Sequence, residues 1–248
     1  MVRNRRFSNF LTGLAVVLSL TVVLACQAVP GSTEAHYIAQ AAMRISLKGN
    51  WTLTALLETN AETDNPDAAV HSGKKTLTVS LDTMKDGSRQ TTYRVSETSL
   101  GLRVIYPRDP TQPLQLIDLS DESVIQNQAD PFLSSTFSYE DITLHFLGWK
   151  TQELAGEETV KDRACWHIVS HPGAGDSTAY SRVESWIDKQ YATLLKAVAY
   201  DASGNVVKEF SVRSFQQIEN AWMPKTLESK SPALKARSRL EILDAKKH

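Results

Sequence analysis

Cysteine is scarce in this sequence, and neither sign of charge is in excess. Only two cysteines occur among 248 residues, and one of them, Cys26, lies near the amino terminus. Once Cys26 is lipidated or removed, Cys165 has no disulfide partner, so packing alone must stabilise the fold. We expect Cys165 to be a buried free thiol. The chain has 27 basic and 28 acidic residues, which excludes the dense basic surface that nucleic-acid binding requires, so no nucleic-acid partner is expected.

The short motifs of common catalytic and cofactor sites are also missing. There is no G-x-S-x-G elbow, H-E-x-x-H pair, P-loop or dinucleotide glycine signature. Cys165, His167 and His171 would share one face of an extended strand, a spacing that suits a soft metal. However, His171 precedes Pro172-Gly173, where that strand should end. We therefore predict no enzyme activity, no cofactor and no metal.

The longest apolar run lies close to the amino terminus. Residues 11–25 (LTGLAVVLSLTVVLA) follow Arg3, Arg5 and Arg6. This run is shorter than the roughly 20 apolar residues of a membrane-spanning helix, so we predict a cleaved signal peptide at residues 1–25. The general secretory route fits better than twin-arginine export, because the residues after the paired arginines depart from that motif. Removing the leader leaves 24 basic against 28 acidic residues, a net charge of −4.

The cleavage site indicates how the chain is anchored. Val23-Leu24-Ala25-Cys26 has the pattern of a lipobox, which predicts Cys26 as a lipid anchor. Gln27, rather than Asp, follows the cysteine and favours a periplasmic protein anchored to the outer membrane. Ordinary cleavage after Ala28 is the alternative. Residues 26–33 contain Pro, Gly, Ser and Thr and are predicted to be a tether.

Residues 34–248 are predicted to be one domain, since single β-rich domains commonly reach 200–250 residues. A helix is expected first, capped by Ser32 or Thr33 and ended by Gly49. Its apolar stripe has helical spacing and consists of Ile38, Ala41, Ala42 and Ile45.

Alternation of apolar and polar residues dominates the rest of the chain. Ser138 and Asp141 have the spacing of a capping box, and residues 58–75 are expected to be a long polar loop. The predicted strands lie at 51–57, 76–82, 91–96, 100–106, 152–159, 164–170, 180–188, 193–200, 205–216, 222–230 and 236–243. This pattern predicts an α+β, mainly β fold: a curved antiparallel sheet with one apolar face, covered by helices.

Aromatic residues are spread over many of these strands, and ordinary packing accounts for any one of them. Collectively, apolar residues on the inner face of an incompletely closed sheet can line a cavity for an acyl chain. The residues that we predict to line it are Leu53, Val79, Leu81, Tyr93, Leu102, Val104 and Trp186.

Four stretches resemble a known family: 131–142 (PFLSSTFSYEDI), 156–169 (GEETVKDRACWHIV), 185–215 and 221–228 (AWMPKTLE). Their order of W-I-D-K, a D-x-x-G-N hairpin and W-x-P is similar to that of the outer membrane lipoprotein-sorting protein family, which shares the fold of the LolA/LolB carriers. The resemblance implies a half-open β-barrel with helices covering the concave face. It also implies a task in handling lipid or acylated lipoprotein, with an inner-membrane transporter as a candidate partner.

Two functions remain open from the sequence. The first is an envelope protein that binds lipid or lipoprotein acyl chains in a hydrophobic cavity, as a carrier or a membrane-docked acceptor. The second is a non-enzymatic interaction or sensor module with a filled core. A cavity of several hundred Å³ with apolar walls would favour the first function.

Overall fold

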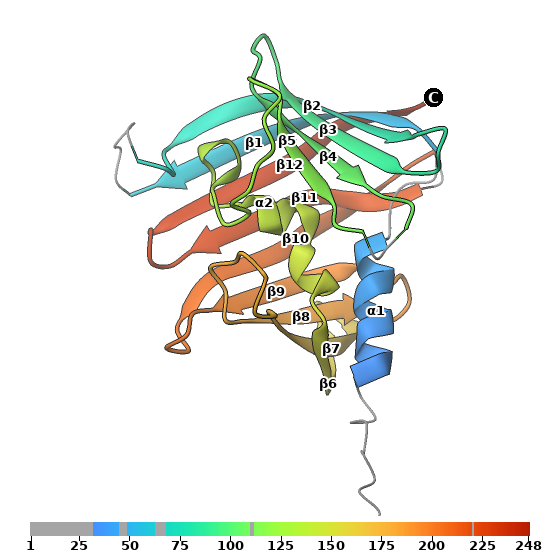
Figure 1. Ribbon diagram of the computed structural model, residues 1–248, viewed down its shortest axis with the longest axis vertical. Helices are drawn as coiled ribbons and strands as arrows, with labels where there is room; N and C mark the ends of the chain where they lie inside the picture. The colour runs from blue at the N-terminus through green and yellow to red at the C-terminus, as the bar shows by residue number, and fades with distance from the viewer. Residues whose placement is uncertain (1–31, 45–48, 63–67, 110–111, 220) are drawn as a thin grey trace, which may run out of the picture.

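A computed structural model describes residues 32–44, 49–62, 68–109, 112–219 and 221–248 (Figure 1). The predicted signal peptide at residues 1–25 and the predicted anchor Cys26 lie outside the described residues. Helix α1 (Ser32–Arg44) begins within residues 26–33, which the sequence predicts to be a tether.

Strands from both halves of the chain form one antiparallel sheet. The first half runs outward from the middle of the sheet through β1 (Trp51–Ala61), β2 (Gly73–Thr83), β3 (Arg89–Val95), β4 (Gly101–Tyr106) and β5 (Gln115–Asp118). The chain then crosses the sheet and returns through β6 (Thr151–Val160), β7 (Arg163–His171), β8 (Arg182–Asp188), β9 (Leu194–Tyr200), β10 (Val206–Ile218), β11 (Ala221–Ser231) and β12 (Ala236–Lys247).

The two meanders join where β12 pairs with β1. The order of the 12 strands is β5-β4-β3-β2-β1-β12-β11-β10-β9-β8-β7-β6, so β5 and β6 are the two edges and the sheet does not close into a barrel. The predicted mainly β fold, a curved and half-open antiparallel sheet, is confirmed.

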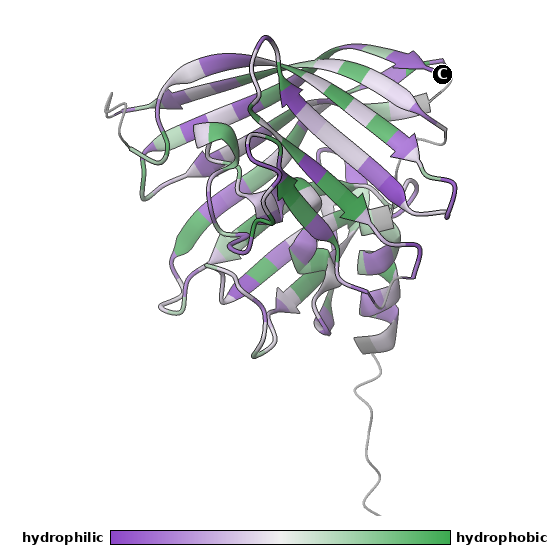
Figure 2. Cartoon of the chain, turned by 45° about the horizontal axis from the view of Figure 1, so that its top comes forward, coloured by the Kyte–Doolittle hydropathy of each residue, from purple (hydrophilic) through white to green (hydrophobic). Residues whose placement is uncertain are grey.

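Hydrophobic and hydrophilic residues alternate along the strands (Figure 2). In β1, Trp51, Leu53, Ala55 and Leu57 are buried, whereas the residues between them are partly exposed. Since side chains of a strand point alternately to its two faces, the buried apolar side chains of β1 all lie on one face, the concave one. The main core therefore lies inside the curve of the sheet.

The segment that crosses the concave face comprises η1 (Phe132–Ser134), α2 (Tyr139–Thr143) and η2 (His145–Gly148). The predicted capping box is present, because the Ser138 side chain accepts from the Asp141 amide and the Asp141 carboxylate accepts from the Ser138 amide. Figure 1 shows α2 in front of the sheet over β10–β12. This crossing segment and α1 together form the helical cover that the sequence predicts.

Aromatic contacts and hydrogen bonds hold the crossing segment on the sheet. Phe132 packs edge-to-face on Tyr93, with ring centroids 5.5 Å apart. The amide of Thr136 donates to the Ser238 hydroxyl over 2.8 Å, and the Thr136 hydroxyl donates to the Ser229 carbonyl over 2.9 Å. Buried backbone groups of an irregular segment need such partners.

Three details differ from the expectations. Strand β5 was not predicted, because its four residues are too few to show an alternation. The expected loop 58–75 is shorter, since β1 extends to Ala61 and β2 begins at Gly73. The buried stripe of α1 is Ala35, Ile38, Ala39 and Ala42, so Ala41 lies beside it, and Ile45 is outside the described residues.

Candidate binding site

A cavity of about 460 Å³ lies between the crossing segment and the strands of the second meander. The side chains that surround it are mostly apolar and come from α1, the crossing segment and seven strands. Those that define its inner walls are Ala42, Tyr93, Phe137, Ile142, Leu144, Leu194, Phe210, Val212, Leu227 and Leu240. Ligand pockets typically occupy roughly 300–1,000 Å³ and have this mostly apolar character.

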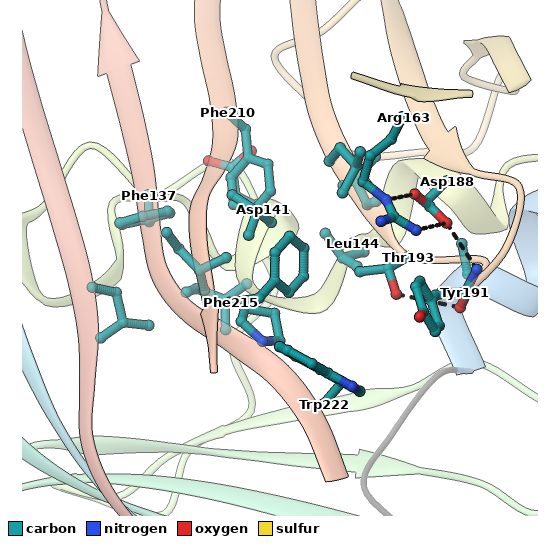
Figure 3. Close-up of a pocket in the computed structure, with 18 of the residues that line it drawn as sticks. Phe137, Asp141, Leu144, Arg163, Asp188, Tyr191, Thr193, Phe210, Phe215 and Trp222 are labelled. Atoms are coloured by element: carbon teal, nitrogen blue, oxygen red, sulfur yellow. Dashed lines mark hydrogen bonds and ion pairs between the residues drawn. The ribbon is translucent and has the colours of Figure 1, made fainter. Parts of the chain in front are cut away.

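The cavity opens where β9 and β10 separate. Their pairing ends at Ser211 and Lys196, and β10 has register shifts between Val212 and Phe215. The aromatic side chains of this region reach solvent: Phe215 is 37% exposed, Tyr191 48% and Trp222 59%. Figure 3 shows Phe215 and Trp222 on one side and Tyr191 on the other. These three residues form the mouth of the cavity.

An ion pair lies at this mouth (Figure 3). The Arg163 guanidinium donates through both Nε and Nη2 to the Asp188 carboxylate. Burial alone would raise the pKa of Asp188, but the bonds from Arg163 and from the backbone amides of Tyr191 and Gln190 hold it below its usual value. The carboxylate is thus charged and fully engaged, and it fixes the arginine.

A second polar cluster forms part of the inner wall. Asp141 accepts from Lys208 Nζ over 2.7 Å and from the Tyr180 hydroxyl over 3.0 Å. Asp141 is buried and Lys208 is half-buried, with side-chain exposures of 5% and 14%. Charges taken out of water need such partners. The cavity wall therefore carries a neutralised carboxylate rather than a free one.

Glu140 lies behind this wall and is completely buried. One of its carboxyl oxygens, Oε2, accepts from the Thr178 hydroxyl over 2.7 Å, whereas Oε1 has no partner among the described residues. Burial raises the pKa of Glu140 from 4.5 to about 8. At neutral pH this side chain is a neutral acid.

A second cavity, of about 280 Å³, continues under the first meander. It shares seven wall residues with the first cavity, which are Tyr93, Ile142, Leu144, Trp222, Pro224, Leu227 and Leu240. Cavities with a shared wall of this extent are adjacent. The concave face thus holds two adjacent cavities, with walls that come from β7 at one end and from β4 at the other.

Most of the residues that we expected to line a cavity lie on the concave face. Leu53, Val79, Leu81 and Tyr93 line the second cavity, and Tyr93 also lines the first. Leu102 and Val104 are completely buried in the main core and touch neither cavity.

Trp186 lies elsewhere. It belongs to a separate small cluster with Cys165, Leu195 and Val198. Its ring stacks on His167, and its indole nitrogen donates to Glu158. The neighbouring residues Val183 and Ile187 face the main core, so the alternation of β8 places Trp186 on the opposite face of the sheet.

Cys165 is a buried free cysteine, as predicted. Burial raises the pKa of its thiol. His167 contacts Glu158 and Glu184 instead of joining Cys165 in a cluster. In the part of the chain that the structure describes, no three His, Cys, Asp or Glu residues lie close enough to hold a metal ion. Of the described helices, none is long and apolar enough to cross a membrane.

Several residues that line the cavity near its mouth were not predicted as site residues, although the sequence holds a signal for them. Asp188 belongs to the W-I-D-K motif, and Trp222 and Pro224 form the W-x-P motif. Both motifs indicated a family resemblance only. The fold brings Asp188 and Trp222, which are 34 residues apart in the chain, together at one opening. The walls contributed by Leu227 and Leu240 carry no signal beyond strand alternation.

Comparisons with known proteins agree with this architecture. Residues 120–248 match a family model described as "Uncharacterized protein", and the chain belongs to that family. No curated protein matches the sequence.

Three solved structures share the fold over most of their lengths. A DUF1329 family protein from Desulfovibrio piger is 17% identical with a TM-score of 0.71, covering 88% of this chain and 93% of its own. A domain assigned as an outer membrane lipoprotein-sorting protein from Vibrio parahaemolyticus is 16% identical, with a TM-score of 0.69 and coverages of 88% and 93%. A LolA superfamily protein from Nitrosomonas europaea is 17% identical, with a TM-score of 0.55 and coverages of 86% and 93%. The expected likeness to the lipoprotein-sorting fold is therefore shown.

Proposed function

We propose that this protein binds the acyl chain of a lipid or an acylated lipoprotein within the concave face of its sheet, and that it acts in the bacterial cell envelope without catalysing a reaction. The observation that carries this proposal is the apolar space itself. Cavities of about 460 and 280 Å³ adjoin each other, and an aromatic mouth opens the larger one to solvent.

The alternative, an interaction module with a filled core, is less well supported. A filled core would leave no such space, because protein interiors pack as densely as organic crystals. The names of two structures with this fold, a lipoprotein-sorting domain and a LolA superfamily protein, fit a role in lipid handling.

Replacing Leu240 by Trp tests the proposal. Leu240 belongs to the shared wall of both cavities, so the larger side chain would occupy the space of the ligand. We expect binding of a fluorescent fatty-acyl probe to weaken about tenfold or more, equal to roughly 1.4 kcal/mol. The free energy of unfolding should fall by less than the ~1–3 kcal/mol that overpacking of a dense core costs. Probe titration and thermal unfolding measure the two quantities.

Leu243→Trp is the matched control, because Leu243 is on the same strand, is 55% exposed and lines neither cavity. It should leave probe binding unchanged. If the wild-type protein binds no acyl probe and Leu240→Trp strongly destabilises it, the cavity is part of a packed core and the proposal is wrong.

Cys26 bears on the location of the protein. We propose that it is the lipidated amino terminus of a periplasmic protein held at the outer membrane, since the lipobox pattern precedes it. Mass spectrometry of gently purified mature protein should show an acylated Cys26 together with any retained lipid. A mature terminus at Val29 without acylation would contradict the anchor but leave the cavity proposal standing.

A further inference from the structure

Arg163 is held rigidly at the mouth of the larger cavity. Its Nε and Nη2 donate to Asp188, and Nη2 also donates to the Gln190 side chain over 3.2 Å. The guanidinium carbon lies 4.9 Å from the centroid of the Tyr191 ring. A planar guanidinium held by a carboxylate and an aromatic ring loses little conformational entropy when it binds a further group.

The Nη1 donors of Arg163 are available to a ligand. A guanidinium has five N–H donors, and within the described part of the chain no hydrogen bond involves Nη1. The Arg163 side chain is 36% exposed and lines the cavity. Its free donors can therefore meet a group that sits at the mouth.

The surroundings select the sign of that group. Asp188 already accepts from Arg163 and from the amides of Gln190 and Tyr191, at 2.9 and 2.8 Å, so it has little capacity left for a cation. A second positive charge is nearby, since the Lys161 ammonium donates to the carbonyl of Val212, a residue of the cavity wall. An oxyanion with two acceptor oxygens is the natural partner of such a site.

We propose that Arg163 binds the anionic head group, a carboxylate or a phosphate, of an amphiphile whose acyl chain lies in the cavity. This inference rests on the proposed function and specifies its ligand class. The head group would stay at the mouth beside Tyr191, and the chain would pass Phe215 and Trp222 into the apolar space (Figure 3).

The rest of the molecule offers a matched control. Arg182 also lies between a carboxylate and an aromatic ring: its Nη2 lies 3.1 Å from the Glu184 carboxylate, and its guanidinium carbon lies 4.0 Å from the Tyr200 ring centroid. It lines neither cavity. Replacing Arg182 by Gln thus removes an equivalent charge and an equivalent ring contact without touching the mouth.

Three probes with the same acyl chain separate the head group from the chain: a fatty acid at a pH where it is ionised, a lysophosphatidate and the uncharged fatty alcohol. We expect wild-type protein to bind at least one of the anions about tenfold more tightly than the alcohol, the effect of one charge-assisted hydrogen bond. Arg163→Gln should abolish this preference, so that neither anion binds more tightly than the alcohol. Arg182→Gln should preserve the preference.

The outcomes distinguish the two proposals. A preference for the fatty acid or for the lysophosphatidate identifies the carboxylate or the phosphate as the head group. Equal wild-type affinity for all three probes, or an anion preference that survives in Arg163→Gln, overturns the role of Arg163 while chain binding stands. No binding of any probe overturns both proposals. If Arg163→Gln fails to fold, the double variant Arg163→Gln/Asp188→Asn removes the pair without leaving Asp188 charged, and the same comparison is made with it.

Discussion

Glu140 is an acidic residue in a position where ionisation is unfavourable, because its side chain is removed from water. It is completely buried, its Oε1 has no partner among the described residues, and burial raises its pKa to about 8. In the unfolded chain the same carboxyl would ionise near 4.5. Between these two values the folded protein retains a proton that the unfolded chain has released. The contribution of Glu140 to the stability of the fold therefore decreases as the pH rises through this range and is constant above it.

We predict that Glu140→Gln stabilises the protein, and more so above pH 8 than near pH 5. The amide keeps a similar shape and cannot ionise. Each unit of pKa shift corresponds to about 1.4 kcal/mol, so the additional gain at alkaline pH is on the order of a few kcal/mol. The neighbours Asp141, Lys208 and Asp176 stay in place and act on both proteins.

Urea unfolding of both proteins at a series of pH values measures this difference. Glu153→Gln on the exposed face of β6 is the control, and its effect on stability should be small at every pH. If the difference in unfolding free energy between Glu140→Gln and the wild type is the same at pH 5 and pH 9, Glu140 is ionised in the folded protein at neutral pH.

At the scale of the elements, the alternation of apolar and polar residues predicted the strands that have one solvent-exposed face. Strands β6–β12 lie within a few residues of their predicted positions, because apolar side chains alternate with polar ones along most of their length. The capping box of α2 was also predictable, because it depends on two residues that are three positions apart. The side chains of Ser138 and Asp141 each accept a hydrogen bond from the other residue's backbone amide. Strand β5 could not be found in this way, since it is short and pairs only with β4.

The candidate site was predictable only in part. The alternation of β1–β3 identified Leu53, Val79 and Tyr93 on the concave face. It misplaced Trp186, because apolar character alone does not tell which face of a strand looks inward when a second small cluster lies on the outer face. The mouth depends on pairing between distant elements: Arg163 on β7 meets Asp188 at the end of β8 only once the hairpins are aligned. The pairing register between separate strands cannot be predicted from a local sequence pattern.

For the whole molecule, the crossing segment decides what the sheet can do. A sheet with 12 strands and two open edges would expose its apolar face if nothing covered it. Phe132 and Phe137 of the crossing segment pack on Tyr93 and Phe210 of the sheet, and Leu144 borders both cavities. The cover therefore encloses space at both meanders instead of filling it. In the proposed function, a ligand chain that enters by the mouth extends from one cavity into the other.

This arrangement predicts that the protein distinguishes chains by length. Affinity should rise by about 0.8 kcal/mol for each methylene buried until both cavities are full, and then level off. Val79 lines the second cavity and not the first, so Val79→Trp should leave short chains bound as before and make the affinity level off at a shorter length. Thr78→Trp, the exposed neighbour on β2, should change neither. Titration with a series of fatty acids of increasing length measures the point of levelling. If Val79→Trp weakens short and long chains equally, the two cavities do not act in sequence, and a ligand chain does not pass from the mouth to β2.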